Sequence, residues 1–248
     1  MDFWERTWRE RQDTLEEAFG TPEPNVAAFS WNDDIRLPGS CAVKFRPSTE
    51  RGRNSWLWVT MGLSQPLSEE QIEEERKAGK EYSARGYELA IQTPGEETWP
   101  ANALFYLLTH ITDGEEIRWG ETFPFGFIES EDNSPHVVVG WSDEMEAKAV
   151  GDLRALLFWP TLKPHSGPLS TSVGLFYVFA ATGITAGELE AAKATSPLHL
   201  QLLLCRTGIG QVTDPQRSSV FEDPAASEEW ERIRVLSVSE ADVQQTVA

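Results

Sequence analysis

The side chains that most often carry catalysis are few and scattered in this sequence. Its four histidines are His110, His136, His165 and His199, and none of them forms a metal-type spacing such as His-Glu-x-x-His. The sequence also contains no Gly-x-Ser-x-Gly nucleophile elbow, no phosphate-binding glycine loop and no Gly-x-Gly-x-x-Gly motif. We therefore predict no catalytic residues, no metal site and no cofactor.

The two cysteines and the carboxylate pairs do not change this prediction. Cys41 and Cys205 both lie in apolar contexts, which favours buried, reduced thiols over a disulfide framework. Cys205 and a distant histidine could be drawn as a catalytic dyad, but a nucleophile within a leucine-rich helix would be inaccessible. The pairs Glu96-Glu97 and Glu115-Glu116 adjoin turns and are most simply solvated. An enzyme interpretation therefore has no residues to support it.

The charge balance is the strongest compositional signal. The 248 residues include 21 basic and 40 acidic side chains, which gives a formal net charge of −19. Such a field repels nucleic acid and anionic membranes and speeds the encounter with a basic partner. The alternative is that the acidity serves only solubility. No apolar run approaches the roughly 20 residues of a membrane helix, and the N-terminus carries no secretory signal, so we expect a cytoplasmic protein.

The most informative stretch, residues 86–112, predicts a strand, a turn and a capped helix. Tyr87, Leu89 and Ile91 alternate with Glu88, Ala90 and Gln92, which is typical of a half-buried strand. Thr98 is the expected N-cap of the helix, and Asp113-Gly114 its expected end. The apolar stripe of this helix consists of Leu104, Leu107, Leu108 and Ile111.

The remaining elements predict an α+β fold, with a mixed, mostly antiparallel sheet packed with helices. An amphipathic helix is expected over residues 5–19, and further helices begin at Thr185 and Ser196. The acidic run 69–75 is either a short solvated helix or a mobile loop, because its spacing lacks the features of a calcium-binding loop. Strands are expected over residues 26–31, 41–45, 56–61, 137–141, 153–159 and 173–181.

The amino-acid composition changes after Phe221 to a mixture of alanine, serine and glutamate, and this change sets the expected domain boundary. Residues 1–221 are predicted to form one domain, and residues 222–248 an acidic C-terminal tail. Trp230, Ile233, Val235 and Leu236 could dock that tail locally.

Several ordered segments resemble the Suppressor of fused domain. The Gly-aromatic-Glu-Leu strand at 86–89, followed by Thr98-Trp99-Pro100 and an aliphatic helix, is similar to the centre of that domain. Similar matches, in the same order, are Trp56 to Ser64, Leu175 to Leu189, Leu200 to Arg206 and Val212 to Asp214. The resemblance runs from about Asn25 to about Phe221, and the chain resembles a bacterial single-domain member.

The resemblance implies a protein-binding domain without catalysis. Animal members of the family restrain a transcription factor by capturing an extended peptide between two lobes by strand addition, and the second lobe has no counterpart here. Many bacterial single-domain members look like immunity proteins of polymorphic toxin systems, and an acidic chain suits a basic toxin such as a nuclease. Two hypotheses follow: an immunity or inhibitor protein that neutralises one cognate toxin, or a regulatory module that sequesters a peptide of a cytoplasmic, transcription-related partner.

The resemblance also suggests a binding surface. The family's peptide groove uses an aromatic residue near the end of the central helix, which falls on His110 here, and an acidic residue after a glycine, which falls on Glu121 after Gly120. Trp119 is the tryptophan least obviously in the core. We predict that His110, Trp119 and Glu121 line a partner surface. The alternative is that His110 caps its helix and Glu121 is merely solvated.

Overall fold

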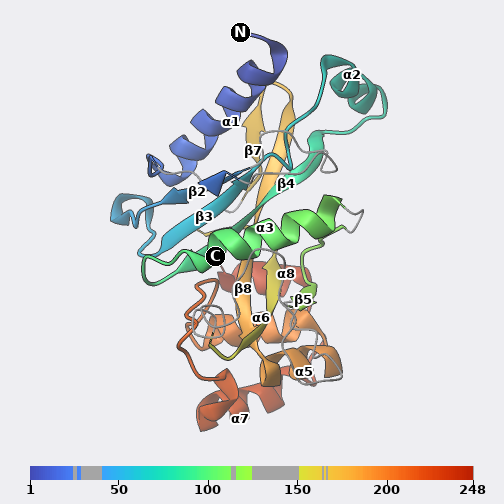
Figure 1. Ribbon diagram of the computed structural model, residues 1–248. Helices are drawn as coiled ribbons and strands as arrows, with labels where there is room; N and C mark the ends of the chain where they lie inside the picture. Colours follow the sequence, from blue (N-terminus) through green and yellow to red (C-terminus); the bar gives the residue numbers. More distant parts are fainter. Residues whose placement is uncertain are drawn as a thin grey trace, which may run out of the picture.

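The computed structural model describes residues 1–24, 27–28, 41–112, 116–124, 151–163, 165 and 167–247. It shows an elongated molecule in which one long central strand, β8 (Gly174–Thr185), runs through most of its length (Figure 1). The predicted helix end at 113–114 and the strand expected over 137–141 lie outside the described residues, as does most of the strand expected over 26–31.

One sheet of eight strands forms the centre of the described fold. Its order is β1-β2-β3-β4-β8-β6-β5, with β7 pairing β8 outside this path. The β4–β8 pair is parallel, and the other described pairs are antiparallel. The strands are β1 (Ala27–Ala28), β2 (Cys41–Phe45), β3 (Trp56–Met61), β4 (Tyr82–Thr93), β5 (Thr122–Pro124), β6 (Leu153–Trp159), β7 (Leu169–Thr171) and β8 (Gly174–Thr185). The mixed, mostly antiparallel α+β prediction is confirmed.

Local capping signals set where several helices begin. Asp2 caps α1 and Thr185 caps α5, each in a capping box with the glutamate three residues later. Ser68 caps the acidic run, so this run is a helix rather than a loop. The described helices are α1 (Phe3–Phe19), α2 (Glu69–Lys77), α3 (Trp99–Thr112), α5 (Ala186–Ala194), α6 (Pro197–Arg206), α7 (Pro224–Ile233) and α8 (Glu240–Val247), with 3-10 turns at Thr49–Arg51 and Val220–Glu222.

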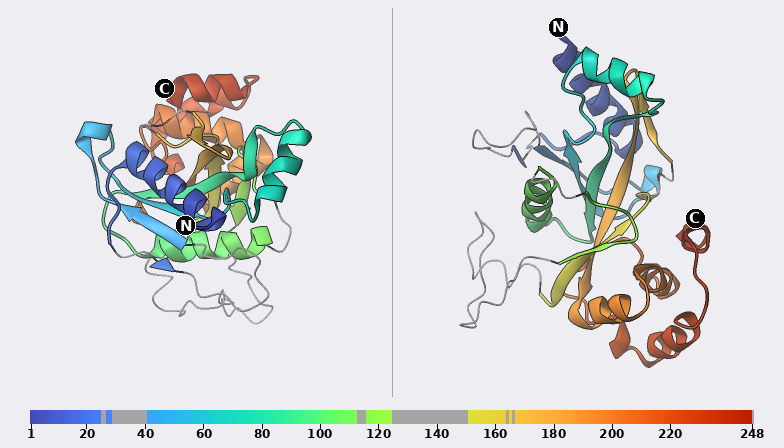
Figure 2. Two further views of the ribbon diagram at one scale, coloured as in Figure 1. Left: turned by 90° about the horizontal axis from the view of Figure 1, so that it is seen from above. Right: turned by 90° about the vertical axis from the view of Figure 1, so that its right-hand side faces the viewer.

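Helices cover both faces of the sheet. Helix α3 packs on one face, while α1 and the C-terminal helices pack on the other (Figure 2). Consequently β4 is buried on both faces from Tyr87 to Thr93, and the prediction of a half-buried strand is wrong. The alternation of Tyr87, Leu89 and Ile91 correctly marks the face under α3. The opposite face carries Glu88 and Gln92, which are polar but buried.

A buried polar network ties α1 to the end of β3 and to β4. The Glu88 carboxylate accepts hydrogen bonds from the Thr60 hydroxyl at 2.6 Å, and from the Gly62 and Ser64 backbone N–H groups at 3.1 and 2.9 Å. The Arg11 guanidinium, on α1, donates to the Ser64 hydroxyl at 3.0 Å and to the Ser83 hydroxyl at 2.7 Å. Because its polar groups are largely paired, the network fixes the position of α1 on the sheet.

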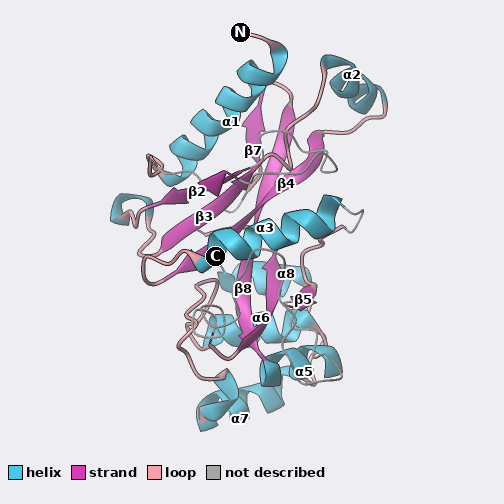
Figure 3. Ribbon diagram, viewed as in Figure 1, coloured by secondary structure: helices cyan, strands magenta, loops and turns pink. Residues whose placement is uncertain are grey.

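The segment that the sequence presents as a tail contains α7 and α8 (Figure 3). Trp230 and Ile233 are buried in the core with α6, as is Val243 of α8, whereas Val235 and Leu236 are exposed. Helices α7 and α8 of this segment therefore pack on the core, whereas the connection between them is exposed at Val235 and Leu236. The division at residue 221 stays a prediction. No helix in the described part of the chain is long and apolar enough to cross a membrane.

Candidate partner-binding surface

Within the described residues, we find no group of three histidine, cysteine or acidic side chains that could hold a metal ion. Both cysteines are free thiols. Burial raises the pKa of Cys41 to about 12 and that of Cys205 to about 11, so both stay protonated at neutral pH. A thiol of this kind is a poor nucleophile.

His110 lies near the C-terminal end of α3, against the edge of the sheet. Its ring centroid is 4.4 Å from that of Tyr106, one turn earlier on the helix, and 5.1 Å from that of Phe123 on β5. Both ring pairs meet edge to face, a favourable geometry for aromatic side chains. His110 and β5 are therefore in contact. We call the surface formed by His110, residues 116–121 and β5 the α3–β5 surface.

A glycine turn presents Trp119 and Glu121 beside β5. Gly120 has a φ of +75°, a conformation that a residue with a Cβ adopts only with strain. Its N–H donates to the Phe158 carbonyl at 2.9 Å, and the Phe158 N–H donates to the Glu121 carbonyl at 3.1 Å. These bonds extend the β5–β6 ladder, so the backbone around Glu121 is fixed while its side chain is exposed and Trp119 is half-buried.

The structure therefore brings the three residues selected from the sequence onto neighbouring elements. His110 contacts Phe123, which lies two residues after Glu121 and four after Trp119. Contact between this surface and a partner stays a prediction. Because Glu121 is exposed and Trp119 half-buried, a protein partner could pair with the carboxylate and pack on the indole.

A hollow of about 440 Å³ beside this surface has no counterpart in the sequence predictions. Its lining includes Tyr82, Arg85, Tyr87 and Glu116. It forms where β4 bulges away from β8, since the register shifts between Tyr82 and Tyr87. The sequence signal for the bulge is Gly86, whose φ is +75° and where an added Cβ would lie 2.9 Å from the Tyr82 Cβ.

An aromatic row crosses β4 and β8 beside this hollow. The Tyr82 and Tyr177 ring centroids are 5.7 Å apart, those of Tyr177 and Phe179 6.3 Å, and those of Phe179 and Tyr87 5.0 Å. Tyr82 is 41% exposed at the open end of the row. Aromatic rings with exposed faces and hydroxyl groups are frequent anchors for protein partners.

Solved structures show the class of domain to which this fold belongs. The Sufu–Fu complex crystal structure contains a chain that matches with a TM-score of 0.61 at 19% identity, over 94% of this chain and 98% of that one. The crystal structure of Drosophila Suppressor of Fused matches with a TM-score of 0.61 at 18% identity, over 91% of this chain but 54% of that one. A Suppressor of fused homologue from Neisseria gonorrhoeae FA 1090, solved at 1.40 Å, matches with a TM-score of 0.55 at 16% identity, over 87% and 97% of the two chains. The fold is that of a Suppressor of fused α+β domain.

The family assignment rests on the sequence of the chain itself. The family model described as Suppressor of fused protein matches residues 39–218, most of the chain. The chain therefore belongs to the Suppressor of fused family, as the ordered sequence motifs indicated. Comparison with curated proteins finds no match.

Proposed function

We propose that this protein is a non-catalytic, cytoplasmic binding domain that neutralises a basic, toxin-like protein, as an immunity or inhibitor protein does. The observation that carries the proposal is the net charge of −19 on a fold of this family. The Sufu–Fu complex supports protein binding as the general activity of the fold. A strongly acidic protein attracts a basic partner at long range and aligns it before contact.

The α3–β5 surface supplies the short-range part of the proposed interaction. The exposed Glu121 carboxylate would pair with a lysine or arginine of the partner, and the half-buried Trp119 would pack on an apolar neighbour of that residue. Tryptophan is enriched among the residues that dominate interface energies. His110 would contact the partner beside Phe123.

A second candidate function, a regulatory module that sequesters an extended peptide, is favoured by one specific observation. Strand β5 stands at the end of the strand order, and within the described residues its ladder partner is β6. A strand at the edge of a sheet can accept a further strand from another chain through backbone hydrogen bonds. The same surface would then hold a peptide rather than a folded toxin.

The test compares tagged variants as baits for affinity capture from the native cells. Wild type is expected to retain a protein that Glu121→Ala and Trp119→Ala retain at least about tenfold more weakly, the effect of losing about 1.4 kcal/mol of binding free energy. Glu70→Ala, which removes the same charge from the exposed face of α2, is the matched control. Thermal denaturation of each bait checks that the variants are folded.

Equal capture by Glu121→Ala, Trp119→Ala and wild type would refute the α3–β5 surface as the binding site. The identity of the captured protein separates the two functions. A single basic protein supports neutralisation, whereas a transcription-related protein that binds through a short segment supports the regulatory module.

A further inference from the structure

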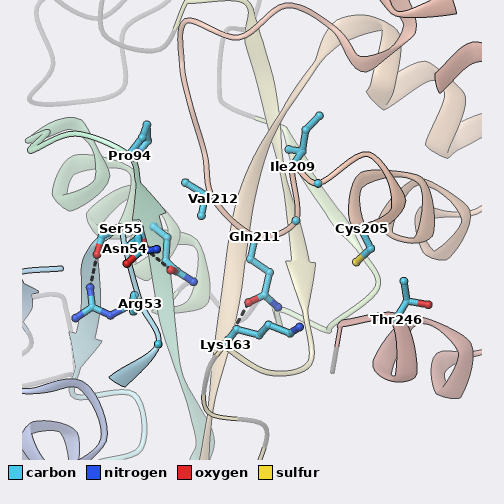
Figure 4. A pocket seen from close by; sticks show the side chains of 14 residues that line it. Arg53, Asn54, Ser55, Pro94, Lys163, Cys205, Ile209, Gln211, Val212 and Thr246 are labelled. Carbon is cyan, nitrogen blue, oxygen red and sulfur yellow. Dashed lines mark hydrogen bonds between the residues drawn. The ribbon is translucent and has the colours of Figure 1, made fainter. Parts of the chain in front are cut away.

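Helix α8 lies at the margin of a groove of about 470 Å³ (Figure 4). One side of the groove consists of the loop before β3 and the end of β4, with Ser55 and Pro94. The other side consists of α6, the loop that follows it and α8, with Cys205, Ile209 and Thr246. Because α8 forms part of this side, the shape of the groove depends on how firmly α8 is held.

The contact of α8 with the core depends on few side chains. Among those that the structure describes, Val243 is buried at 1% exposure and belongs to the core cluster that contains the leucines of α6, along which α8 packs. Ala241, Asp242, Gln245 and Thr246 are exposed. One valine contributes only a small part of the apolar burial that holds a domain together, so α8 is attached weakly.

The hydrogen bonds of the described residues of α8 stay within the helix and its first turn. The Ser239 hydroxyl and backbone N–H donate to the Asp242 carboxylate at 2.6 and 2.8 Å. The Thr246 hydroxyl donates to the Asp242 carbonyl at 2.8 Å. These bonds favour the helical conformation, but they do not link α8 to another element.

The connection between α7 and α8 is exposed and makes few contacts. Val235 is 74% exposed and Leu236 50%. The His199 Nε2, on α6, lies 3.1 Å from the Leu236 carbonyl, and Val238 packs partly on the core. A connection of this kind can change its conformation while α7 keeps its place.

Helix α8 is also too short to be stable by itself. It spans eight residues, whereas an isolated helix of fewer than about 12–15 residues is marginal in water. Its structure therefore depends on its contact with α6. Strand β8, by contrast, lies between β4 and β6 and is buried along its second half. Elements with few buried contacts open locally, at much lower free energy than the core of the same protein.

We propose that α8 is a strap that opens and closes at the groove independently of the rest of the fold. In the closed state Val243 packs beside α6 and Thr246 forms part of the groove wall. In the open state this part of the wall is absent, and the apolar surface that covers Val243 is accessible. Access to the α6 side of the groove therefore depends on α8. This inference does not depend on the proposed function.

The test is amide hydrogen exchange of the full chain at pH 7, expressed as protection factors. We expect the amides of α8 to be protected at least about 100-fold less than the slowest amides of β8, because α8 opens without global unfolding. Val243→Ala should lower the protection of α8 a further tenfold or so, since it removes apolar contact from the closed state, and should leave the slowest β8 amides unchanged. Val235→Ala, in the exposed connection, is the matched control and should change neither.

Three results would overturn the proposal. Equal protection of α8 and of the slowest β8 amides would mean that α8 opens only when the whole domain unfolds. A loss of protection in β8 as large as that in α8 for Val243→Ala would mean that the two elements form one cooperative unit. A complete lack of protection in α8 of the wild-type protein would mean that the strap does not close.

Discussion

Replacement of Glu88 by alanine is expected to be among the most destabilising single changes in the molecule. The residue is 1% exposed, and its carboxylate is the acceptor for the Gly62 and Ser64 N–H groups. The Thr60 and Ser64 hydroxyl groups can rotate towards other acceptors, whereas the two backbone N–H groups cannot. A buried donor without an acceptor costs about 1–3 kcal/mol, so Glu88→Ala should lower the free energy of unfolding by about 2–6 kcal/mol.

The assay is urea denaturation of Glu88→Ala at pH 7, compared with Glu74→Ala on the exposed face of α2. The control should lie within about 0.5 kcal/mol of wild type. Since domains are stable by only about 5–15 kcal/mol, the expected loss will show clearly. A loss for Glu88→Ala no larger than that of the control would refute the claim that this network holds α1 and the turn after β3.

The same residue gives a pH dependence with a definite sign. Burial raises the pKa of Glu88, and hydrogen bonds from Thr60, Ser64 and Gly62 offset part of that rise. The folded protein therefore binds the proton more tightly than the unfolded chain, whose glutamates titrate at about pH 4.3. The stability contributed by protonation is fully present below that pH and is lost as pH rises through the higher folded-state pKa. Relative to Glu88→Gln, wild type should lose stability as pH rises from about 4.3, and equal slopes would contradict this.

Three further predictions concern the turn, a buried ion pair and the thiols. Gly120→Ala should lower the free energy of unfolding by about 1 kcal/mol, because its positive φ disfavours a Cβ; thermal denaturation measures this, and an unchanged Tm would argue against the turn. Arg217→Ala should cost about 3–5 kcal/mol in urea denaturation, since it leaves the fully buried Glu188 carboxylate without its partner; a loss below about 1 kcal/mol would contradict this. The thiols of Cys41 and Cys205 should react slowly with a thiol reagent at pH 8 until the protein unfolds, because their pKa values are raised to about 12 and about 11; rapid reaction of the native protein would be the contrary result.

Local patterns in the sequence were sufficient for elements with clear boundaries. Strands β2, β3 and β6 have the predicted bounds, and Pro160 ends β6 because proline cannot donate to a ladder. The helix start at Thr185 likewise depends only on neighbouring residues, whereas α1 begins at Phe3 after the Asp2 cap, two residues before the expected start.

Tertiary contacts decided the features that the sequence patterns missed. Arg11 lies on a helix rich in charged residues, yet it is buried because its partners come from Ser64, Gln65 and Ser83, more than fifty positions away. No periodicity within α1 contains that information. The segment from Val212 to Asp214, which resembles a strand of the family, forms no strand in the described chain: Val212 makes an isolated bridge to Gln92, and the Thr213 N–H donates to the Gln92 carbonyl.

The candidate surface likewise combines residues that the sequence could select with contacts that only the fold could show. His110 and Glu121 could be selected one at a time from the family resemblance, but the contact of His110 with Phe123 depends on how the chain returns to the sheet.

The measurement that tests the central claim most directly is affinity capture of the tagged protein at low and at high salt, with mass spectrometry of the retained proteins. Attraction between an acidic domain and a basic partner is screened within about 10 Å at 0.1 M salt. The account predicts one basic partner, retained at low salt and reduced or slower to bind at high salt. Capture of no protein, or of an acidic partner whose retention is the same at low and high salt, would contradict it.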